Sequence, residues 1–271
     1  MKITFLGTCS GTEPQPGRRH CSFVIEHHEA VYWFDAGESC SYNAHLAGIN
    51  LLSTEAVFIS HTHMDHIGGL PNLLWNIRKI NGITPNPERR ISGKTIGVFL
   101  PDLAVWQGIT QLLRGTEGGF EIDFNLNATL CRDGDLYQNN GFQVTALHNL
   151  HLGTPAPGDP WKSFCYLIEA DGKRIVFSGD VASIDDVAPL LDNCDLFLME
   201  TGHHKVEDVC NYLKKSGKNF GKLGFIHHGR AILGDVNKER EKARRILGDQ
   251  VFITEDGDVL DNKLDPVALQ V

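Results

Sequence analysis

Residues 61–69, with the sequence HTHMDHIGG, constrain this chain more than any other feature. They place three histidines and an aspartate directly after a short apolar segment, EAVFIS, at residues 55–60. Apolar residues then recur at helical spacing up to Ile77, and Pro71 is tolerable only in the first turn of such a helix. The pattern predicts a buried strand that carries metal-capable side chains at its end and turns at once into a helix.

The spacing within this motif predicts two neighbouring cation positions. In extended backbone, residues i and i+2 point the same way, so His61 and His63 can share one cation. The turn into the helix displaces Asp65 and His66 toward a second position. A bridging anion would hold two such cations together, and Asp180, which follows the predicted strand in VFSGD, can serve.

Two further histidine pairs stand at the ends of predicted strands. His148 and His151 occur in LHNLH, and His227 and His228 occur in FIHHGR. Loops at strand ends are where sites are usually built on a rigid scaffold. We expect each pair to supply one ligand, and the spacing leaves open which member does so.

Charge argues against a general nucleic-acid binder. The net charge is −9 at pH 7 and the sequence pI is about 5.8, whereas affinity for phosphate backbones rests largely on Lys and Arg. The most basic stretch, residues 214–222 (KKSGKNFGK), is typical of a solvated helix end.

The cysteines and the apolar runs indicate the compartment. The seven cysteines are scattered, odd in number and without C-x-x-C spacing, so they indicate neither a disulfide framework nor a thiolate zinc site. Neither a signal peptide nor an apolar run of about 20 residues is apparent. We expect a cytoplasmic protein with reduced thiols and no membrane association.

The order of predicted elements favours one domain, residues 1–271. Strands and hairpins dominate the first part, and strands alternate with helices in the later part. This order suggests two sheets packed face to face with helices outside. We expect strands at residues 2–7, 22–26, 30–37, 55–60, 95–100, 120–125, 141–148, 165–170, 173–178, 194–200, 222–228 and 249–254, and helices at residues 67–77, 102–113, after Asp185, and at 206–217 and 236–248.

Several of these segments together resemble a known superfamily. HTHMDH with a preceding FDAG, a downstream histidine, SGD and a final histidine resembles the metallo-β-lactamase fold superfamily. Within it, FLGTCSGTEP and ISHTHMDHIGGLPNLL are similar to the ribonuclease Z-like phosphodiesterase branch, and the resemblance covers most of the chain. It implies an α/β fold, a four-layer αββα sandwich of two mixed sheets with outer helices.

The resemblance also implies a ligand set for two divalent metal ions. Zinc suits such imidazole-rich ligation, and manganese or iron is compatible with it. His151 is preferred to His148, and His227 to His228, by position in the family pattern. The implied ligands are His61, His63 and His151 for the first metal, Asp65, His66 and His227 for the second, and Asp180 as the bridge, with Asp35 of FDAG orienting ligands behind them.

The implied reaction is hydrolysis of a phosphodiester bond by a metal-bridging hydroxide. Asp65 would orient the nucleophile, and Glu200 would hold His203 as the general acid for the leaving oxygen. His204 remains an alternative to His203, because METGHHK is shorter than the family's segment. Arg230, near the last motif, is either a phosphate clamp or an ordinary surface residue.

One departure bears on the substrate. Ribonuclease Z commonly has a long Gly/Pro-rich arm for tRNA between the positions matched by His151 and Asp180, and residues 152–179 leave no room for it. We therefore expect a small or nucleotide-like substrate, with RNA not favoured. The alternatives are hydrolysis of a carboxyl substrate (lactone, thioester or lactam) and an iron-loaded redox or binding protein. Relatives in the superfamily are often dimers, which allows a homodimer here.

Overall fold

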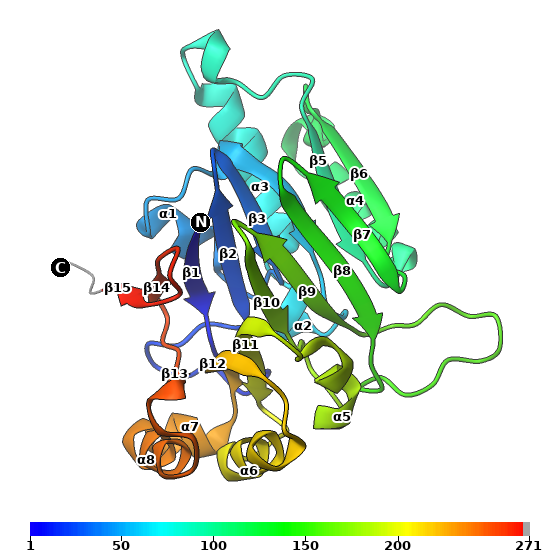
Figure 1. Cartoon of the computed structure of the whole chain (residues 1–271). Coiled ribbons are helices and arrows are strands. Elements are labelled where there is room, and N and C mark those ends of the chain that lie inside the picture. The colour runs from blue at the N-terminus through cyan, green and yellow to red at the C-terminus, as the bar shows by residue number, and fades with distance from the viewer. Residues whose placement is uncertain (268–271) are drawn as a thin grey trace.

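Two β-sheets pack face to face in the computed structural model, which describes residues 1–267 (Figure 1). Within that range the first sheet has eight strands in the order β15-β14-β1-β2-β3-β4-β5-β6 and the second has seven in the order β13-β12-β11-β10-β9-β8-β7. The strands of the first sheet are β1 (Lys2–Gly7), β2 (Ser22–His27), β3 (Ala30–Phe34), β4 (Thr54–Phe58), β5 (Thr95–Leu100), β6 (Asn125–Leu130), β14 (Val259–Leu260) and β15 (Pro266–Val267). Those of the second are β7 (Gly134–Asn139), β8 (Phe142–His148), β9 (Phe164–Ala170), β10 (Lys173–Phe177), β11 (Cys194–Thr201), β12 (Phe220–His228) and β13 (Val251–Ile253).

Both sheets are mixed, as predicted. Pairing is antiparallel from β14 through β3 and from β7 through β10, and it is parallel from β3 to β6 and from β10 to β13. Parallel strands end at the same edge of a sheet, and ligands of open α/β sheets bind outside these carboxyl ends. The motifs that follow β3, β4, β10, β11 and β12 are therefore gathered at one edge of the sandwich.

Aromatic side chains fill the space between the sheets. Phe23 stacks on Phe34 in its own sheet at 5.1 Å between ring centroids and meets Phe177 of the other sheet edge-on at 5.1 Å. Tyr32 stacks on Phe142 across the sheets at 3.7 Å. These rings are fully buried, and such pairs add about 0.5–1.5 kcal/mol each beyond the burial of their area. The core thus holds the two sheets in a fixed relation.

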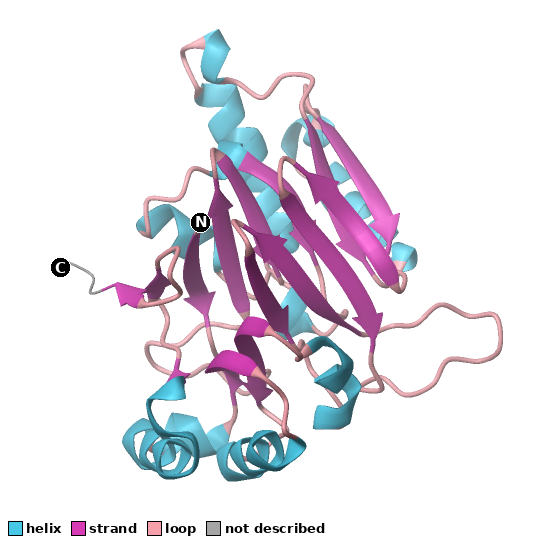
Figure 2. Ribbon diagram, in the orientation of Figure 1, coloured by secondary structure: helices cyan, strands magenta, loops and turns pink. Residues whose placement is uncertain are grey.

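Helices cover the outer faces of both sheets and complete the predicted four-layer αββα sandwich (Figure 2). Apolar side chains on α1 (Cys40–Leu46), α3 (Leu70–Ile83) and α4 (Leu103–Arg114) pack on the first sheet. The second sheet is covered by α5 (Ile184–Val187), α6 (Val206–Ser216), α7 (Arg230–Gly234) and α8 (Val236–Leu247). The short α2 (Met64–Ile67) precedes α3, whose first turn contains Pro71, and Asp102 caps α4 by accepting from the backbone N–H of Ala104 at 2.8 Å, both as predicted.

Two sequence predictions need correction, and several elements were missed. Residues 120–125 are not a strand, because two glycines at positive φ, Gly118 and Gly119, bend the chain before them and β6 begins only at Asn125. The helix predicted after Asp185 begins at Ile184, where Ser183 and Asp186 form a capping box. The polar β7, the two-residue β14 and β15, and α1 were not predicted, because none of them has a long periodic apolar pattern.

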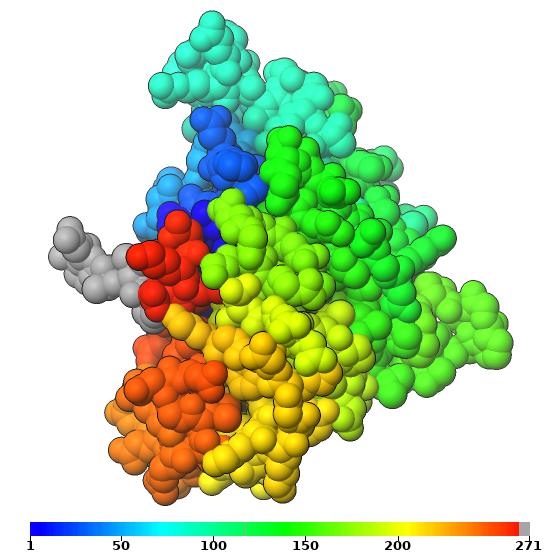
Figure 3. All heavy atoms as spheres, in the orientation of Figure 1, coloured from blue at the N-terminus to red at the C-terminus, as the bar shows by residue number. Residues whose placement is uncertain are grey.

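A loop at residues 152–163 projects from the molecule between β8 and β9 (Figure 3). It contains the sequence GTPAPGDP, and β9 and β10 follow it before Asp180. The interval predicted to lack a long arm therefore holds a short projecting loop and a hairpin. Among the helices of residues 1–267, none has the length and apolarity needed to cross a bilayer.

Candidate metal centre

The loop after β4 carries the first predicted ligands. His61 is buried and held by a bridge to Ser163, and His63 is the extended residue (φ −66°, ψ 149°) from which α2 starts. Because the backbone is extended there, the two imidazoles face the same side. Nε2 of His61 lies 3.0 Å from Nδ1 of His63.

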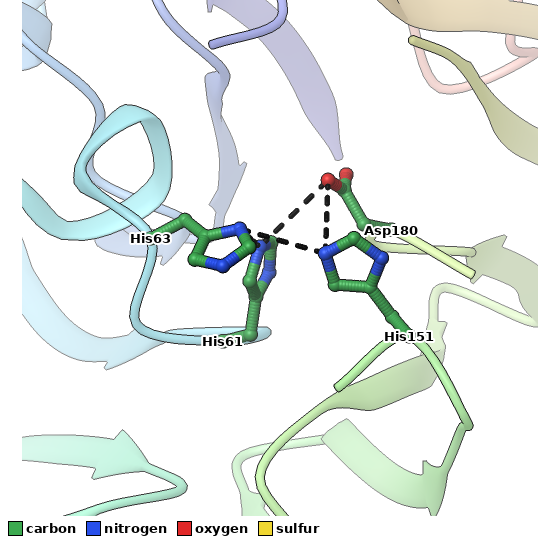
Figure 4. Close-up of side chains that lie close together, drawn as sticks. All are labelled: His61, His63, His151 and Asp180. Atoms are coloured by element: carbon green, nitrogen blue, oxygen red, sulfur yellow. Dashed lines mark hydrogen bonds and ion pairs between the residues drawn. The ribbon is translucent and has the colours of Figure 1, made fainter. Parts of the chain in front are cut away.

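His151 completes a first cluster from a different part of the chain (Figure 4). Its Nε2 lies 3.5 Å from Nδ1 of His63, although 88 residues separate them in sequence. The two nitrogens belong to loops that follow β4 of one sheet and β8 of the other. The packing of the two sheets therefore brings these loops together.

A second cluster lies beside the first and is more deeply buried. Nε2 of His66 lies 3.1 Å from Nε2 of His227 and 3.2 Å from Oδ2 of Asp65. Oδ2 of Asp65 in turn lies 3.0 Å from Nε2 of His227. Two imidazole nitrogens and one carboxylate oxygen thus converge on one point.

Asp180 stands between the two clusters. Its Oδ2 lies 3.7 Å from Nε2 of both His61 and His151, whereas its Oδ1 lies 3.4 Å from Nε2 of His66 and 3.3 Å from Nδ1 of His227. The residue is 2% exposed, and Oδ1 is buried without a hydrogen-bond partner within residues 1–267. Each oxygen of one carboxylate therefore faces a different cluster.

A β-bulge aims His227 at this site. Glu200 pairs with Ile226 and Thr201 pairs with His228, so His227 is the extra residue on β12. Its φ of 53° is unusual for a residue with a side chain, and such strain concentrates at functional sites. Bulges are known to redirect side chains next to active sites. The sequence carries no local signal for the bulge itself.

Asp35 and Ser60 support the ligands from behind. Asp35 accepts hydrogen bonds from the backbone N–H of Ser60 at 2.7 Å and from its hydroxyl at 2.8 Å, and its Oδ2 lies 2.7 Å from Nδ1 of His66. Because the Ser60 hydroxyl donates its hydrogen bond to Asp35, its Oγ accepts one from Nδ1 of His61 at 3.1 Å. Both imidazoles are thereby held with Nε2 directed at the clusters. Ser60 was missed by the sequence analysis, although it directly precedes the HTHMDH motif.

Glu200 and His203 lie at the open side of the clusters. Oε1 of Glu200 lies 3.0 Å from Nδ1 of His203, and Oε2 accepts from the His203 backbone N–H at 2.9 Å. The hydrogen bond that His203 donates to Glu200 raises the pKa of His203 above its ordinary value. Glu200 is fully buried, whereas the His203 side chain is 48% exposed. Nε2 of His204 lies 3.0 Å from the backbone oxygen of Val181 and 3.6 Å from Oε1 of Glu200.

The other members of the histidine pairs are engaged elsewhere. His148 lies 2.6 Å from Asp133 and stacks on Trp161 at 3.8 Å between ring centroids. His228 lies 2.8 Å from the backbone oxygen of Thr254. The structure thus brings His151 and His227 into the clusters and leaves their neighbours outside.

Arg230 and the basic stretch at residues 214–222 have acidic partners. Arg230 donates two hydrogen bonds to the carboxylate of Glu13, at 3.0 and 2.8 Å. In the basic stretch, Lys218 pairs with Asp192 at 2.6 Å, and Lys222 pairs with Asp265. These contacts weaken both features as sites for a nucleic-acid backbone.

Electrostatics within the clusters suits divalent cations. Burial lowers the pKa of His61 and of His151, which favours the neutral imidazole that binds metals. Burial acts to raise the pKa of Asp180, but the charges of His227 and His66 outweigh it, and the pKa falls below its ordinary value. The donor set of imidazole nitrogens and carboxylate oxygens, with an unpartnered buried oxygen between the clusters, therefore fits divalent metal ions.

Comparison with known proteins agrees with this fold. A ribonuclease Z from Picrophilus torridus is 25% identical over an alignment that covers 94% of each protein. The metallo-β-lactamase fold protein YhfI from Bacillus subtilis matches in structure with a TM-score of 0.72 at 20% identity, covering 96% of this chain and 99% of that one. The short form of human tRNase Z matches with a TM-score of 0.68 at 20% identity and the same coverages.

A family model shows where the chain belongs. The model described as "Anti-Pycsar protein Apyc1" matches residues 1–219, which is most of the 271-residue chain. The two mixed sheets with outer helices are those of the metallo-β-lactamase fold. The chain belongs to the Anti-Pycsar protein Apyc1 family and is a metal-dependent hydrolase of the metallo-β-lactamase fold.

Proposed function

We propose that this protein hydrolyses small, nucleotide-like phosphodiesters at a centre for two divalent metal ions. The observation that carries the proposal is the division of the Asp180 carboxylate, whose Oδ2 faces His61 and His151 while its Oδ1 faces His66 and His227. A carboxylate between two nitrogen-rich clusters is the arrangement that a bridged pair of cations requires.

The two clusters would each hold one ion. The proposed ligands are His61, His63 and His151 for the first ion, Asp65, His66 and His227 for the second, and Asp180 for both. Zinc is the expected metal, because the site is rich in imidazole, and manganese and iron are compatible with it. Two cations held there would supply Lewis-acid activation of a water molecule and stabilisation of negative charge on the phosphoryl group.

The protein's own groups prepare the site for that chemistry. Asp35 fixes His66 directly and His61 through Ser60, so Nε2 of each ring is the nitrogen that is placed to bind a metal ion. Asp65 is held by His66 and His227 at the edge of the second cluster, where its carboxylate can orient an attacking water.

His203 is proposed as the general acid. Its Nδ1 is held by Glu200, and its Nε2 has no hydrogen-bond partner within residues 1–267. Nδ1 also lies 3.8 Å from Oδ2 of Asp180, which places the ring beside the first cluster. A half-exposed imidazole anchored in this way can give its Nε2 proton to the leaving oxygen of a phosphodiester.

Substrate size is inferred from the net charge and from the acidic partners of the basic stretch. The net charge is −9, and lysines of the basic stretch pair with Asp192 and Asp265. Binding of a long RNA would need several unpaired basic groups along its backbone. The similarity to a ribonuclease Z supports phosphodiester chemistry, and these features favour a small molecule over tRNA.

The decisive experiment is hydrolysis of bis(p-nitrophenyl) phosphate by protein reconstituted with zinc or manganese. We expect metal-dependent turnover that falls in Asp180→Ala by more than about a hundredfold, the upper end of the loss typical for outer-shell groups. Asp133→Ala is the matched control, because it removes a carboxylate that pairs with a histidine outside the clusters.

The outcomes separate the parts of the proposal. Full metal content and full rate in Asp180→Ala would show that the carboxylate does not bridge. A wild type that holds two metal ions but hydrolyses only lactones or thioesters would overturn the phosphodiester assignment. Tight tRNA binding that vanishes steeply with added salt would overturn the assignment of a small substrate.

A further inference from the structure

A second group of metal-capable side chains lies at the opposite end of the sandwich. His27 is the last residue of β2, His28 lies in the turn between β2 and β3, and Asp171 lies in the turn between β9 and β10. Strand β3 runs from this turn toward Asp35, and β10 runs from its turn toward Asp180, so the group and the metal centre occupy opposite ends of these strands. In Figure 1 both turns lie beside the N-terminus, away from α2.

The three side chains converge although they come from different sheets. Nitrogen and carboxylate atoms suited to metal binding, one from each residue, all lie within 4.8 Å of one another. Nε2 of His27 lies 3.0 Å from Oδ1 of Asp171, and the rings of His27 and His28 lie 4.1 Å apart between centroids. The other oxygen of Asp171 accepts from the amino group of Met1 at 2.8 Å, which lowers the pKa of Asp171 and keeps it ionised.

One ring nitrogen of His27 has no hydrogen-bond partner in the described part of the protein. The residue is 2% exposed, and its Nδ1 is buried without a hydrogen-bond partner within residues 1–267. Buried ring nitrogens are normally paired, because an unpaired one costs about 1–3 kcal/mol. The hydrogen bonds of the described residues therefore leave one nitrogen of this buried ring unused.

His28 is also costly for the turn that it occupies. It has a φ of 53° in a two-residue connection between antiparallel strands, a position that favours Gly, Asn or Asp. Its side chain is exposed beside His27. A histidine in this position provides an imidazole at the expense of the turn.

We propose that His27, His28 and Asp171 form a further metal site, which takes one divalent transition-metal ion such as Zn²⁺. Two imidazoles and one carboxylate are a ligand set that zinc accepts, with water in the remaining position. The ion would tie the β2–β3 turn of one sheet to the β9–β10 turn of the other. Its role would be structural, and the site is independent of the function proposed for the metal centre.

The test is the zinc content of untagged protein after saturation with Zn²⁺ and desalting, measured by mass spectrometry of the metal. We expect His28→Ala and Asp171→Asn each to hold one zinc ion fewer per chain than the wild type. Both residues are exposed, so the variants should fold, and circular dichroism would verify this. His45→Ala removes an exposed imidazole from α1 and should retain the wild-type zinc content.

Activity distinguishes this site from the metal centre. Hydrolysis of bis(p-nitrophenyl) phosphate should be unchanged in His28→Ala and Asp171→Asn, because neither residue lies near the catalytic clusters. Equal zinc content in the wild type and both variants would overturn the proposal and leave the group as a hydrogen-bonded clamp. If the wild type shows no phosphodiesterase activity but each variant still holds one zinc ion fewer than the wild type, this proposal stands.

Discussion

Asp35 lies 2.7 Å from Nδ1 of His66, fully buried behind the second cluster. The same carboxylate accepts from the hydroxyl of Ser60, which contacts His61 of the first cluster. One aspartate therefore sets the orientation of an imidazole in each cluster. This explains why FDAG, remote in sequence from HTHMDH, accompanies it in the fold.

Removal of Asp35 should weaken metal binding at both clusters. We expect Asp35→Ala to lower metal affinity about 10–100-fold, the range found for such supporting groups. Ser60→Ala should have a smaller effect, because it acts through His61 alone. Competition with a chelating dye measures both. Asp102→Ala, which removes the cap of α4 and a 3.8 Å ion pair with Lys162, should cost about 1 kcal/mol of unfolding free energy and leave metal affinity unchanged.

Loss of the Glu200–His203 pair should slow hydrolysis without loss of metal. We expect His203→Ala to lower kcat about 10²–10⁴-fold for substrates with an alkoxide leaving group, the usual contribution of a general acid. The loss should be much smaller with p-nitrophenolate, which leaves without a proton. His204→Ala removes the neighbouring imidazole, whose Nε2 lies 3.0 Å from the backbone oxygen of Val181 and 3.6 Å from Oε1 of Glu200, and it should have the smaller effect. An equal loss for both leaving groups would argue against proton transfer by His203.

Gly11 should tolerate no side chain. A Cβ built there would lie 2.9 Å from Cγ of Asp65, so Gly11→Ala should displace that carboxylate and lower kcat with little change in the melting temperature. Gly82→Ala is the matched control, because a Cβ at this position of α3 meets nothing within 4 Å. It should raise the unfolding free energy by about 0.5–1 kcal/mol and preserve activity. A fully active Gly11→Ala would contradict the close approach.

The aromatic layer between the sheets should dominate stability. Phe23 contacts Phe34 and Phe177 and is fully buried. We expect Phe23→Ala to lower the unfolding free energy by about 3–5 kcal/mol, measured by urea denaturation. Below its melting transition the variant should keep its metal content, because Phe23 touches none of the proposed ligands. A loss under 1 kcal/mol would mean that the sheets are held mainly by other contacts.

Local patterns were sufficient for much of the fold. The apolar period from Ile67 to Ile77 predicted α3, and Asp102 predicted the start of α4. Polar or very short elements such as β7 and β14 were missed, because their pairing depends on neighbouring strands rather than on a pattern of their own. The residues 120–125 resembled a strand, but the glycines before them shift the strand to Asn125.

The sequence by itself determined the chemistry that this protein can hold. His61, His63, Asp65 and His66 are placed by the local geometry of a strand that turns into a helix, which short-range spacing specifies. Only the tertiary structure decided the rest. It selected His151 and His227 over their neighbours, joined Asp35 to His66, and set Asp180 between two clusters. These contacts span the packing of two sheets and a bulge in β12, and spacing along the chain carries no information about such long-range geometry.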